Sequence, residues 1–361
     1  MPQQQTALAV TEIGKPVSKI SRPIPEPRKG EVLIRVTVAG LNPHDAKARE
    51  GLFTKGHLPA ILAADVVGVV TSVGPHVTRF KPGDRVFGQT TLLGEDLGGH
   101  FNFGPPNWDT AGLQEYAILE TRFSAKVPAG FTDAEAATLP CNLVAAVVGL
   151  FDPSCLGLPA PWDARVSDFD YKGTSLLIIG GGANTGKFAI QAAAAVGVGN
   201  IIVVAGRRSA EEAKALGATH VIDRMKSSTE IAAEVREVVG EDLIYAFDMI
   251  NPADSQHIGV EALSNTRPGK LARLIPVGGI DESKLSAKKH AGYEVLNVPG
   301  VSPLRLGTTV PLWEYVTGWA EDGKIKPTPF QVINGLDVDA VNKTLDGYSH
   351  GTTSGQWQVQ F

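Results

Sequence analysis

A glycine-rich turn at residues 180–187, with the sequence GGGANTGK, carries the clearest chemical signal in the chain. It follows the apolar run 174–179 and precedes the alanine-rich segment 187–197, which is the order of a buried strand, a turn and a helix. Such turns let backbone N–H groups and the start of the helix hold a pyrophosphate, although Ala183 replaces the middle glycine of the strict GxGxxG pattern. The predicted cofactor-binding residues of the turn are Gly180, Gly181, Gly182, Ala183, Asn184, Thr185 and Gly186.

The same stretch almost matches the phosphate-binding loop of ATPases and GTPases, GxxxxGK[ST], over residues 181–188. The last position is Phe188, which has no hydroxyl with which to ligate magnesium. We therefore prefer a dinucleotide as the ligand, because the turn lies within several successive strand–helix units.

Two arginines indicate which dinucleotide this is. The second strand of the predicted sheet ends in AGRRS, residues 205–209, where a NAD site usually has an acidic residue for the ribose 2′-hydroxyl. Arg207 and Arg208 suit a 2′-phosphate instead, through paired guanidinium–phosphate hydrogen bonds. Ser209 either adds a hydroxyl or caps the next helix, and a solvated basic turn is the alternative interpretation. With Gly206 in the same turn, the sequence predicts NADP(H) as the cofactor.

Two parts of the chain with different patterns must position these residues. In residues 1–140, alternating and β-branched runs predict a β-rich domain. Its strands are expected at 31–40, 65–74, 81–88 and 113–119. From residue 174 to 279, apolar runs alternate with helical segments, which is typical of a doubly wound parallel sheet. In this part strands are expected at 174–180, 200–206, 220–223, 243–250 and 271–279, and helices at 187–197, 209–217 and 228–240. The expected class is α/β plus β.

Helices are also expected before and after this parallel sheet in the sequence. Residues 131–151 are predicted to form one helix, with Thr132 as the N-cap and Glu135 as its capping-box partner. The tail from about residue 310 is predicted to hold one more helix and a final strand at 356–361.

Composition excludes several classes of function. A chain of 361 residues suits two domains, and a net charge of -5 with a pI near 5.9 gives no sign of a nucleic-acid or membrane surface. No apolar run reaches the length of a membrane span and the N-terminus does not resemble a signal peptide, so a cytoplasmic location is expected. Cys141 and Cys155 are expected to be ordinary thiols.

Seven segments together resemble the medium-chain dehydrogenase/reductase superfamily over nearly the whole chain. They are AGLNPHDAK (39–47), 59–74, FKPGDRVFG (80–88), LQEYAI (113–118), AATLP (136–140), 180–193 and AKALGATHVID (213–223). NPHDAK and the GLPAP…GGGANTG stretch are similar to zinc-free fungal members, namely quinone-oxidoreductase-like proteins and trans-acting enoyl reductases that serve polyketide synthases. The resemblance implies a GroES-like β-barrel-type catalytic domain, 1–140 completed by 310–361, and an NADP-binding Rossmann domain, 141–309.

The resemblance also raises the question of a metal. Zinc-dependent members have a cysteine after the first catalytic strand and a Gly-His-Glu further on, where this chain has Leu41-Asn42-Pro43 and Ala63-Ala64-Asp65. A lone His44 with a neighbouring carboxylate is not a tetrahedral site, so no metal is expected. Without a Lewis acid to lower the pKa of an alcohol, we expect hydride addition to an activated C=C bond.

The resemblance assigns further residues by position. The NPHDAK segment is expected to be a loop at the nicotinamide end of the cleft, with Lys47 as the first catalytic candidate and His44 and Asp45 as the second. A surface lysine and a loop or helix cap are the alternatives for Lys47 and Asp45. Further cofactor contacts are expected at Arg224 (adenine), Ile275 and Pro276 (nicotinamide carboxamide), and Thr353 and Ser354. The expected substrate-pocket residues are Ala145, Val148, Gly149, Asp152, Asn297, Val298 and Pro299. Ala145 stands where several relatives have a hydroxyl residue, which puts in doubt a mechanism that needs one there.

Three functions remain open at this stage. The first is an NADPH-dependent enoyl reductase, which would act on a small-molecule or carrier-protein-bound enoyl substrate with a polyketide synthase as partner. The second is a stand-alone quinone or alkenal reductase, and the third a noncatalytic NADPH-binding partner protein. The predicted loops 92–112 and 152–173 either shape the cleft or act as spacers, and the protein is expected to be a monomer or a homodimer.

Overall fold

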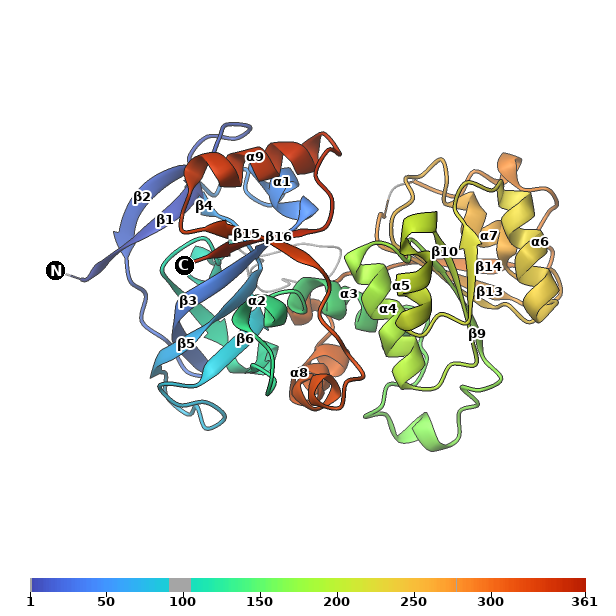
Figure 1. Cartoon of the computed structure of the whole chain (residues 1–361), viewed down its shortest axis with the longest axis horizontal. Coiled ribbons are helices and arrows are strands. Elements are labelled where there is room, and N and C mark those ends of the chain that lie inside the picture. The colour runs from blue at the N-terminus through green and yellow to red at the C-terminus, as the bar shows by residue number, and fades with distance from the viewer. Residues whose placement is uncertain (1, 91–104, 277) are drawn as a thin grey trace. The chain divides into compact units, whose positions relative to one another are not determined.

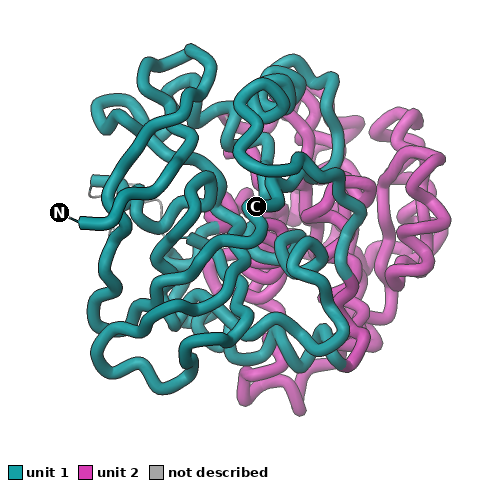
Figure 2. Tube along the Cα trace, turned by 60° about the vertical axis from the view of Figure 1, so that its left-hand side comes forward, with its two compact units in different colours: residues 1–141, 301–321, 327–361 teal, residues 142–300, 322–326 magenta. Residues whose placement is uncertain are grey.

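A computed structural model describes residues 2–90, 105–276 and 278–361. Most of the predicted loop 92–112 lies outside these ranges. The chain forms two units, which Figure 2 distinguishes by colour. Unit 1 contains residues 1–141, 301–321 and 327–361, and unit 2 contains residues 142–300 and 322–326.

In the described part of unit 1, seven strands form a sheet in the order β15-β16-β3-β5-β6-β8, with β7 paired to β3 (Figure 1). They are β3 (Glu31–Leu41), β5 (Asp65–Val73), β6 (Arg85–Gln89), β7 (Tyr116–Glu120), β8 (Ser124–Lys126), β15 (Phe330–Asn334) and β16 (Gln356–Gln360). The strands expected at 31–40, 65–74 and 356–361 are confirmed. β3 alternates between buried and less buried side chains, as its sequence predicts, and its buried side chains join the apolar core of the unit.

A second sheet in unit 1 was not predicted. Its strands run antiparallel in the order β2-β1-β4 and are β1 (Gln4–Val10), β2 (Ser18–Pro23) and β4 (Ala60–Ile61). Leu8 on β1 is fully buried in the same apolar core.

The helices of this part of the chain differ from the predictions in two places. They are α1 (Pro43–Arg49), α2 (Asp133–Ala136), α8 (Leu306–Glu321) and α9 (Val338–Ser349), with short 3₁₀ turns at Trp108–Thr110, Thr121–Phe123 and Ser302–Leu304. The predicted single helix 131–151 is wrong: α2 ends at Ala136 and α3 (Pro140–Phe151) begins at a proline, a residue suited to the first turn of a helix. The N-cap Thr132 and its capping-box partner Glu135 are confirmed. The tail contains two helices and two strands rather than one of each.

Six parallel strands in the described part of unit 2 form a doubly wound sheet in the order β11-β10-β9-β12-β13-β14. They are β9 (Ser175–Ile179), β10 (Asn200–Ala205), β11 (His220–Asp223), β12 (Tyr245–Asp248), β13 (Gly269–Arg273) and β14 (Tyr293–Asn297). Its helices are α4 (Asn184–Ala195), α5 (Ala210–Ala215), α6 (Ser228–Val239) and α7 (His257–Ala262), with 3₁₀ turns at Ala164–Ser167, Arg207–Ser209 and Glu282–Lys284. Figure 1 shows α4 and α5 on one face of the sheet and α6 and α7 on the other, so the predicted doubly wound architecture is confirmed.

One strand of this sheet is shorter than predicted, and one was missed. β13 ends at Arg273 instead of reaching residue 279, because Pro276 has no N–H for a ladder and Gly278 adopts a positive φ of 62°. β14 was not predicted. No disulfide joins Cys141 and Cys155.

Among the residues that the structure describes, the stretch Asp133–Phe151, which comprises α2 and α3, is long and apolar enough by length and composition to cross a membrane, which the sequence analysis did not anticipate. Of its apolar window, 78% is buried within the protein, as in the core helix of a globular fold.

Candidate active site

The predicted phosphate-binding turn connects β9 to α4 in unit 2. The N-cap residue Ala183 makes no side-chain hydrogen bond to the start of α4, so the first N–H groups of this 12-residue helix are not capped by it. Uncapped N–H groups at a helix start are the donors that hold a phosphate. The Thr185 hydroxyl donates to Asn142 Oδ1 at 3.0 Å, and Phe188 is fully buried in the core.

Two glycines of this turn are required by its geometry. Gly180 has a φ of 98°, a conformation that side-chain-bearing residues rarely adopt. A Cβ on Gly186 would overlap the carbonyl oxygen of Gly180, so only glycine lets α4 approach the end of β9 this closely.

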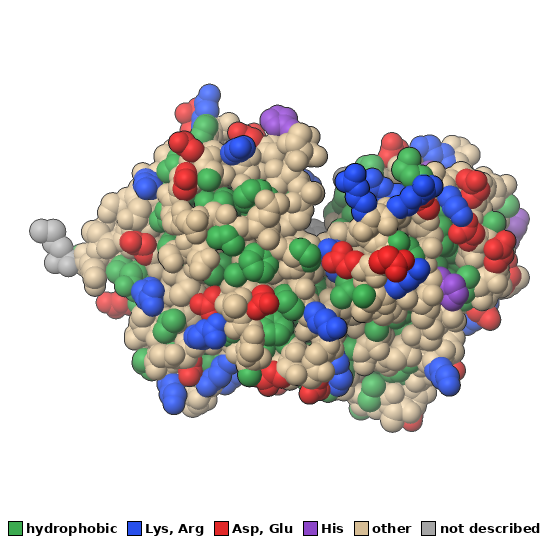
Figure 3. Space-filling model, viewed as in Figure 1, with side chains coloured by type: hydrophobic (Ala, Val, Ile, Leu, Met, Phe, Trp, Pro, Cys, Tyr) green, Lys and Arg blue, Asp and Glu red, His purple; other side chains and the backbone are tan. Residues whose placement is uncertain are grey.

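Three arginines lie at the carboxyl ends of the neighbouring strands. Arg207 and Arg208 follow β10, and Arg224 follows β11, where its backbone N–H donates to the Ala205 carbonyl at 3.0 Å. All three side chains are exposed, and the Nε of Arg224 lies 3.5 Å from the place that a Cβ on Gly206 would occupy. We call Arg207, Arg208 and Arg224 the basic cluster. Figure 3 shows Lys and Arg side chains gathered at this upper end of unit 2.

Ser209 connects the basic cluster to the phosphate turn. Its Oγ lies 2.7 Å from the place that a Cβ on Gly182 would occupy, and it occupies the N-cap position of α5 without making a side-chain capping bond. The predicted pyrophosphate and 2′-phosphate contacts are therefore adjacent in unit 2.

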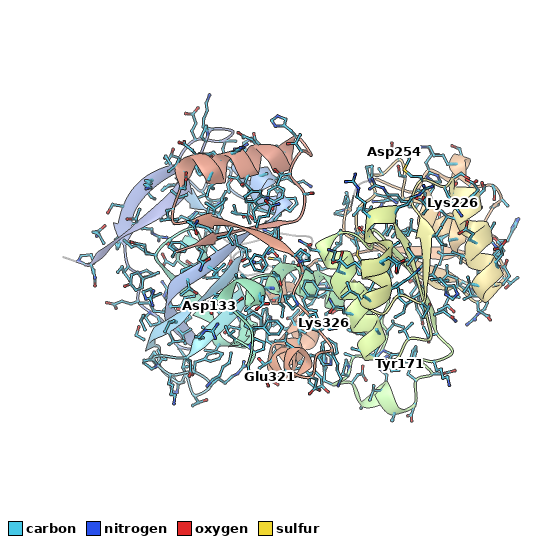
Figure 4. The ribbon with its side chains drawn as sticks, viewed as in Figure 1. Asp133, Tyr171, Lys226, Asp254, Glu321 and Lys326 are labelled. Atoms are coloured by element: carbon cyan, nitrogen blue, oxygen red, sulfur yellow. The ribbon has the colours of Figure 1, made fainter. Side chains whose placement is uncertain are left out.

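An acidic residue that the sequence analysis missed lies beside the basic cluster. Asp223, the last residue of β11, accepts a hydrogen bond from Arg207 Nε at 2.7 Å, and this bond lowers the pKa of Asp223. Arg207 is 87% exposed despite this bond, so it can exchange the carboxylate for another anion. Lys226, which Figure 4 labels at the upper end of unit 2, pairs with Glu234. The acidic end of the predicted strand 220–223 is the signal that would have identified Asp223.

Ile275 and Pro276 lie just beyond β13, one residue after its end, at the same edge of the sheet as the phosphate turn. The Ile275 carbonyl accepts a hydrogen bond from Gln256 Nε2 at 2.8 Å. Ile250, also missed, is 40% exposed beside Gly180, so it offers an apolar surface to a ligand at this turn.

The NPHDAK segment in unit 1 forms α1, so the prediction of a loop was wrong. Asn42 has the extended conformation of an N-cap, and Pro43 at the first helical position fits a helix start. Asp45 is buried, and its carboxylate accepts from the backbone N–H of Asn42 at 2.8 Å and of Ala63 at 2.9 Å. Asp45 thus serves as the helix cap that was its alternative interpretation.

The other two candidates on α1 are more accessible. Lys47 is exposed, and His44 is partly exposed with its Nε2 3.8 Å from Asp45 Oδ2. The buried Arg49 fastens the end of α1 to α9 through Asp346 at 2.7 Å. Lys47 is therefore an accessible cation on a firmly anchored helix.

Asp65 forms the centre of a buried polar cluster close to α1. Its carboxylate is fully buried and accepts hydrogen bonds from Asn42 Nδ2 at 2.6 Å, the Cys141 N–H at 2.6 Å and Gln356 Nε2 at 3.1 Å. Burial raises the pKa of Asp65 to about 6, against the opposing effect of these hydrogen bonds. The Cys141 thiol accepts from Gln89 Nε2 at 3.5 Å, and its pKa is raised by burial.

This cluster does not fit a catalytic zinc. The positions that hold metal ligands in zinc-dependent members carry Asn42 and Ala64, and the Asn42 amide is bonded to Asp65. Among residues 2–90, 105–276 and 278–361, no group of three or more His, Cys, Asp or Glu side chains could hold a metal ion. We therefore derive no step through zinc.

Thr353 and Ser354 lie in the turn between α9 and β16 of unit 1. The Thr353 N–H donates to the Gly347 carbonyl at 3.0 Å, and its side chain packs on the Cα of Gly347. Ser354 is exposed.

The predicted substrate residues of unit 2 fall into two groups. Ala145 packs against Gly300, so α3 does meet the segment that follows β14, which contains Val298 and Pro299. Val148 is 0% exposed and Gly149 packs against the ring of Phe247, so neither offers a side-chain surface to a substrate.

The remaining two residues differ in their contacts. Asp152 is buried and accepts from the N–H of Ser154 at 3.0 Å, which ends α3 in a turn. Asn297, the last residue of β14, is exposed at the carboxyl edge of the sheet.

Comparisons with known proteins agree with this geometry. Residues 28–129 match the family model of the alcohol dehydrogenase GroES-like domain, and residues 185–292 match the model named zinc-binding dehydrogenase. The chain is 26% identical to dehydrogenase orsE of Emericella nidulans (97% of each chain) and 30% identical to trans-enoyl reductase opdC of Penicillium oxalicum (76% of this chain, 72% of that one). It is 31% identical to 2-methylene-furan-3-one reductase of Solanum lycopersicum (97% and 76%).

Solved structures show the same fold. An alcohol dehydrogenase superfamily protein from Novosphingobium aromaticivorans aligns with a TM-score of 0.78 at 24% identity over 99% of each chain. A mycobacterial protein, Rv1454c, solved in complex with NADPH, aligns with a TM-score of 0.72 at 21% identity over 99% of this chain and 100% of that one.

A GroES-like unit and a doubly wound nucleotide-binding unit together define an oxidoreductase fold. The chain belongs to the medium-chain dehydrogenase/reductase superfamily, whose members use NAD(P)H.

Proposed function

We propose that the protein is an NADPH-dependent reductase that adds hydride to an activated C=C bond without zinc. The observation that carries this proposal is the Asn42–Asp65 hydrogen bond, because an amide that is already bonded to a buried carboxylate occupies one position where a metal-dependent relative has a ligand, and Ala64 occupies the other. Alcohol oxidation depends on that Lewis acid to lower the pKa of the hydroxyl. An alkene conjugated to a carbonyl needs only a hydride, a proton and donors for the developing enolate.

NADPH is the proposed cofactor. The uncapped start of α4 supports the pyrophosphate, and the exposed Arg208 and Arg224 support the 2′-phosphate. A mycobacterial structure of the same fold binds NADPH. When bound, NADPH supplies the hydride.

We assign charge stabilisation or proton donation in this reaction to Lys47, the accessible cation of α1. Lys47 is exposed and its helix is fixed by caps at both ends, so its ammonium group is accessible to stabilise negative charge or to donate a proton. Asp45, with its carboxylate held by two backbone N–H groups, positions that helix and takes no proton in this proposal.

A carrier-bound enoyl thioester is the proposed substrate, with a polyketide synthase as the partner that presents it. The relative opdC, of which the match covers 72%, is named a trans-enoyl reductase, and this supports a substrate delivered by another protein.

A free enone or alkenal is the second candidate. The tomato relative, at 31% identity, is named as a reductase of 2-methylene-furan-3-one, a small molecule with an exocyclic alkene beside a ketone. Both candidates share the hydride addition and differ in how the substrate arrives.

The test is NADPH oxidation, followed by absorbance, with crotonyl-pantetheine, a free alkenal and a quinone, each with and without EDTA. Turnover of the thioester that EDTA leaves unchanged supports the first candidate, and turnover of the alkenal or quinone alone supports the second. NADPH binding without turnover of any substrate would favour a noncatalytic partner protein. EDTA-sensitive activity that zinc restores would refute the metal-free chemistry.

A further inference from the structure

Three polar side chains lie in a row across the carboxyl edge of the parallel sheet. In the strand register Asp248 of β12 is opposite Arg273 of β13, and Arg273 is opposite Asn297 of β14. Neighbouring residues in register on parallel strands project to the same face. The carboxyl edge of such a sheet is where ligands of doubly wound folds bind.

Arg273 is the centre of this row. Its side chain is 7% exposed, and its guanidinium donates from Nε to Asn297 Oδ1 at 2.9 Å, from Nη1 to Gln256 Oε1 at 2.7 Å and from Nη2 to the Gly278 carbonyl at 2.9 Å. A guanidinium has only donors, so an amide side chain in contact with it must present its oxygen. Arg273 therefore fixes which way both amides point.

Gln256 shows the consequence of this orientation. Because its oxygen faces Arg273, its Nε2 is directed the other way and donates to the carbonyls of Asn251 at 2.9 Å and Ile275 at 2.8 Å. The two N–H bonds of the Gln256 amide therefore hold the backbone at Asn251 and at Ile275, and Ile275 is the residue expected beside the nicotinamide.

Asn297 is oriented in the same way but differs in exposure. Its Oδ1 faces Arg273, so the two N–H bonds of Nδ2 are directed away from the guanidinium, and the side chain is exposed. Within the described ranges of the chain, Nδ2 makes no hydrogen bond. The backbone around it is also fixed, since the Val298 N–H donates to the Arg273 carbonyl at 2.9 Å and the Asn297 carbonyl accepts from the Cys155 thiol at 3.8 Å.

We propose that Asn297 is a catalytic residue that donates a hydrogen bond from Nδ2 to the carbonyl oxygen of the activated alkene, with Arg273 as the positioning residue that aims it. The inference rests on the proposed reductase function and adds to it a residue that recognises the substrate. Its physical basis is that a preoriented donor costs no reorganisation when charge develops on the oxygen it faces.

The electron balance shows what the donor does. When hydride forms a C–H bond at the β-carbon, the π pair of the C=C bond moves toward the α-carbon and carbonyl, and the oxygen gains negative charge. A proton that the Lys47 ammonium releases in the proposed reaction then bonds to the α-carbon and the carbonyl reforms. Asn297 gives up no proton in either step, so it favours alkenes conjugated to a carbonyl through a hydrogen bond alone.

The experiment uses Asn297→Ala and Asn297→Asp with crotonyl-pantetheine and NADPH. The first variant removes the donor, and the second replaces it with an acceptor of the same shape. The matched control is Asn334→Ala, which removes an exposed asparagine at the end of β15 in unit 1. We expect kcat to fall about 100-fold in both Asn297 variants, as for loss of one oxyanion donor, with the NADPH Kd within about twofold of the parent. The control should match the parent in both quantities.

Three results would overturn the inference. The first is a kcat in both Asn297 variants equal to that of the control. The second is a rise in the NADPH Kd as large as the fall in kcat, which would place Asn297 in cofactor binding. Recovery of kcat in Asn297→Asp alone would also refute a donor role, because a carboxylate cannot donate.

A binding arm separates this inference from the proposed function. Calorimetry would measure the affinity of the saturated thioester butyryl-pantetheine for the protein loaded with NADP⁺. If the parent chain reduces no substrate, the proposed function fails, and a tenfold weaker affinity in Asn297→Ala than in Asn334→Ala would still support carbonyl recognition by Asn297. Equal affinity in the two variants would count against it.

Discussion

The buried carboxyl group of Asp65 should make the stability of this protein depend on pH in an unusual direction. The perturbation is Asp65→Asn, which keeps the shape of the side chain and removes its titration. Asp65 is fully buried, and burial raises its pKa from 3.8 to about 6. Most carboxylates paired in folded proteins are shifted the other way.

The magnitude follows from this shift. A difference of about 2 pH units between the unfolded and folded pKa corresponds to roughly 3 kcal/mol. Between pH 6 and pH 4 the folded chain binds a proton at Asp65 that the unfolded chain does not, so stability from this group increases as the pH falls. At pH 7 the ionised carboxylate therefore costs the folded state roughly 2.5 kcal/mol relative to pH 4, where the unfolded carboxyl group is itself partly protonated.

Urea denaturation of parent and variant at pH 7, 6, 5 and 4 would measure this. The free energy of unfolding of the parent minus that of Asp65→Asn should rise by roughly 2.5 kcal/mol from pH 7 to pH 4. Asp84→Asn is the control: although burial opposes it, the hydrogen bond from Lys126 lowers the pKa of Asp84, so the stability from this group is lost only below about pH 4 and the corresponding difference should change little from pH 7 to pH 4. A difference for Asp65 that is flat, or that decreases toward pH 4, would refute the reasoning.

Three further predictions concern the cofactor and the reaction. Gly186→Ala should lose about 1–3 kcal/mol of stability and weaken NADPH binding, because its Cβ would overlap the Gly180 carbonyl; denaturation and fluorescence titration would measure both, and unchanged values would contradict the close approach. Arg208→Glu should raise the NADPH Kd at least tenfold and leave the NADH Kd within twofold, and an equal loss for both dinucleotides would exclude a 2′-phosphate contact. Lys47→Ala should reduce kcat about 10- to 100-fold without changing the circular dichroism spectrum, because the side chain is exposed, and full activity would leave Lys47 as a surface lysine.

Strands with strong local patterns could be predicted, and weakly patterned elements could not. β9 is apolar on both faces and β3 alternates, so both were found from the sequence. β14 lies at the edge of its sheet and none of its side chains is fully buried, so it has neither signal. α1 has only seven residues and begins with a proline, so its N-cap Asn42 was interpreted as part of a loop.

The residues of the candidate site likewise include some that could be predicted from the sequence and some that could not. The phosphate turn and Arg207–Ser209 are contiguous segments whose residue types indicate their chemistry, so a single sequence was enough to propose them. The Arg273–Asn297 bond joins residues 24 positions apart, and it exists only because β13 and β14 pair in one register. Asp65 likewise depends on Gln356, which is 291 positions away. Contacts set by strand pairing carry no local signal.

The place of β16 in its sheet affects the order in which the chain can fold. This strand lies between β15 and β3, although β3 ends at Leu41 and β16 begins only at Gln356. During synthesis on the ribosome, β3 therefore cannot pair with β16 until most of the chain has been made. Unit 2 draws all but five of its residues from the continuous segment 142–300 and can fold during that interval. Non-local pairing of this kind slows folding, so we expect unit 1 to be the last part of the protein to become protected from proteolysis.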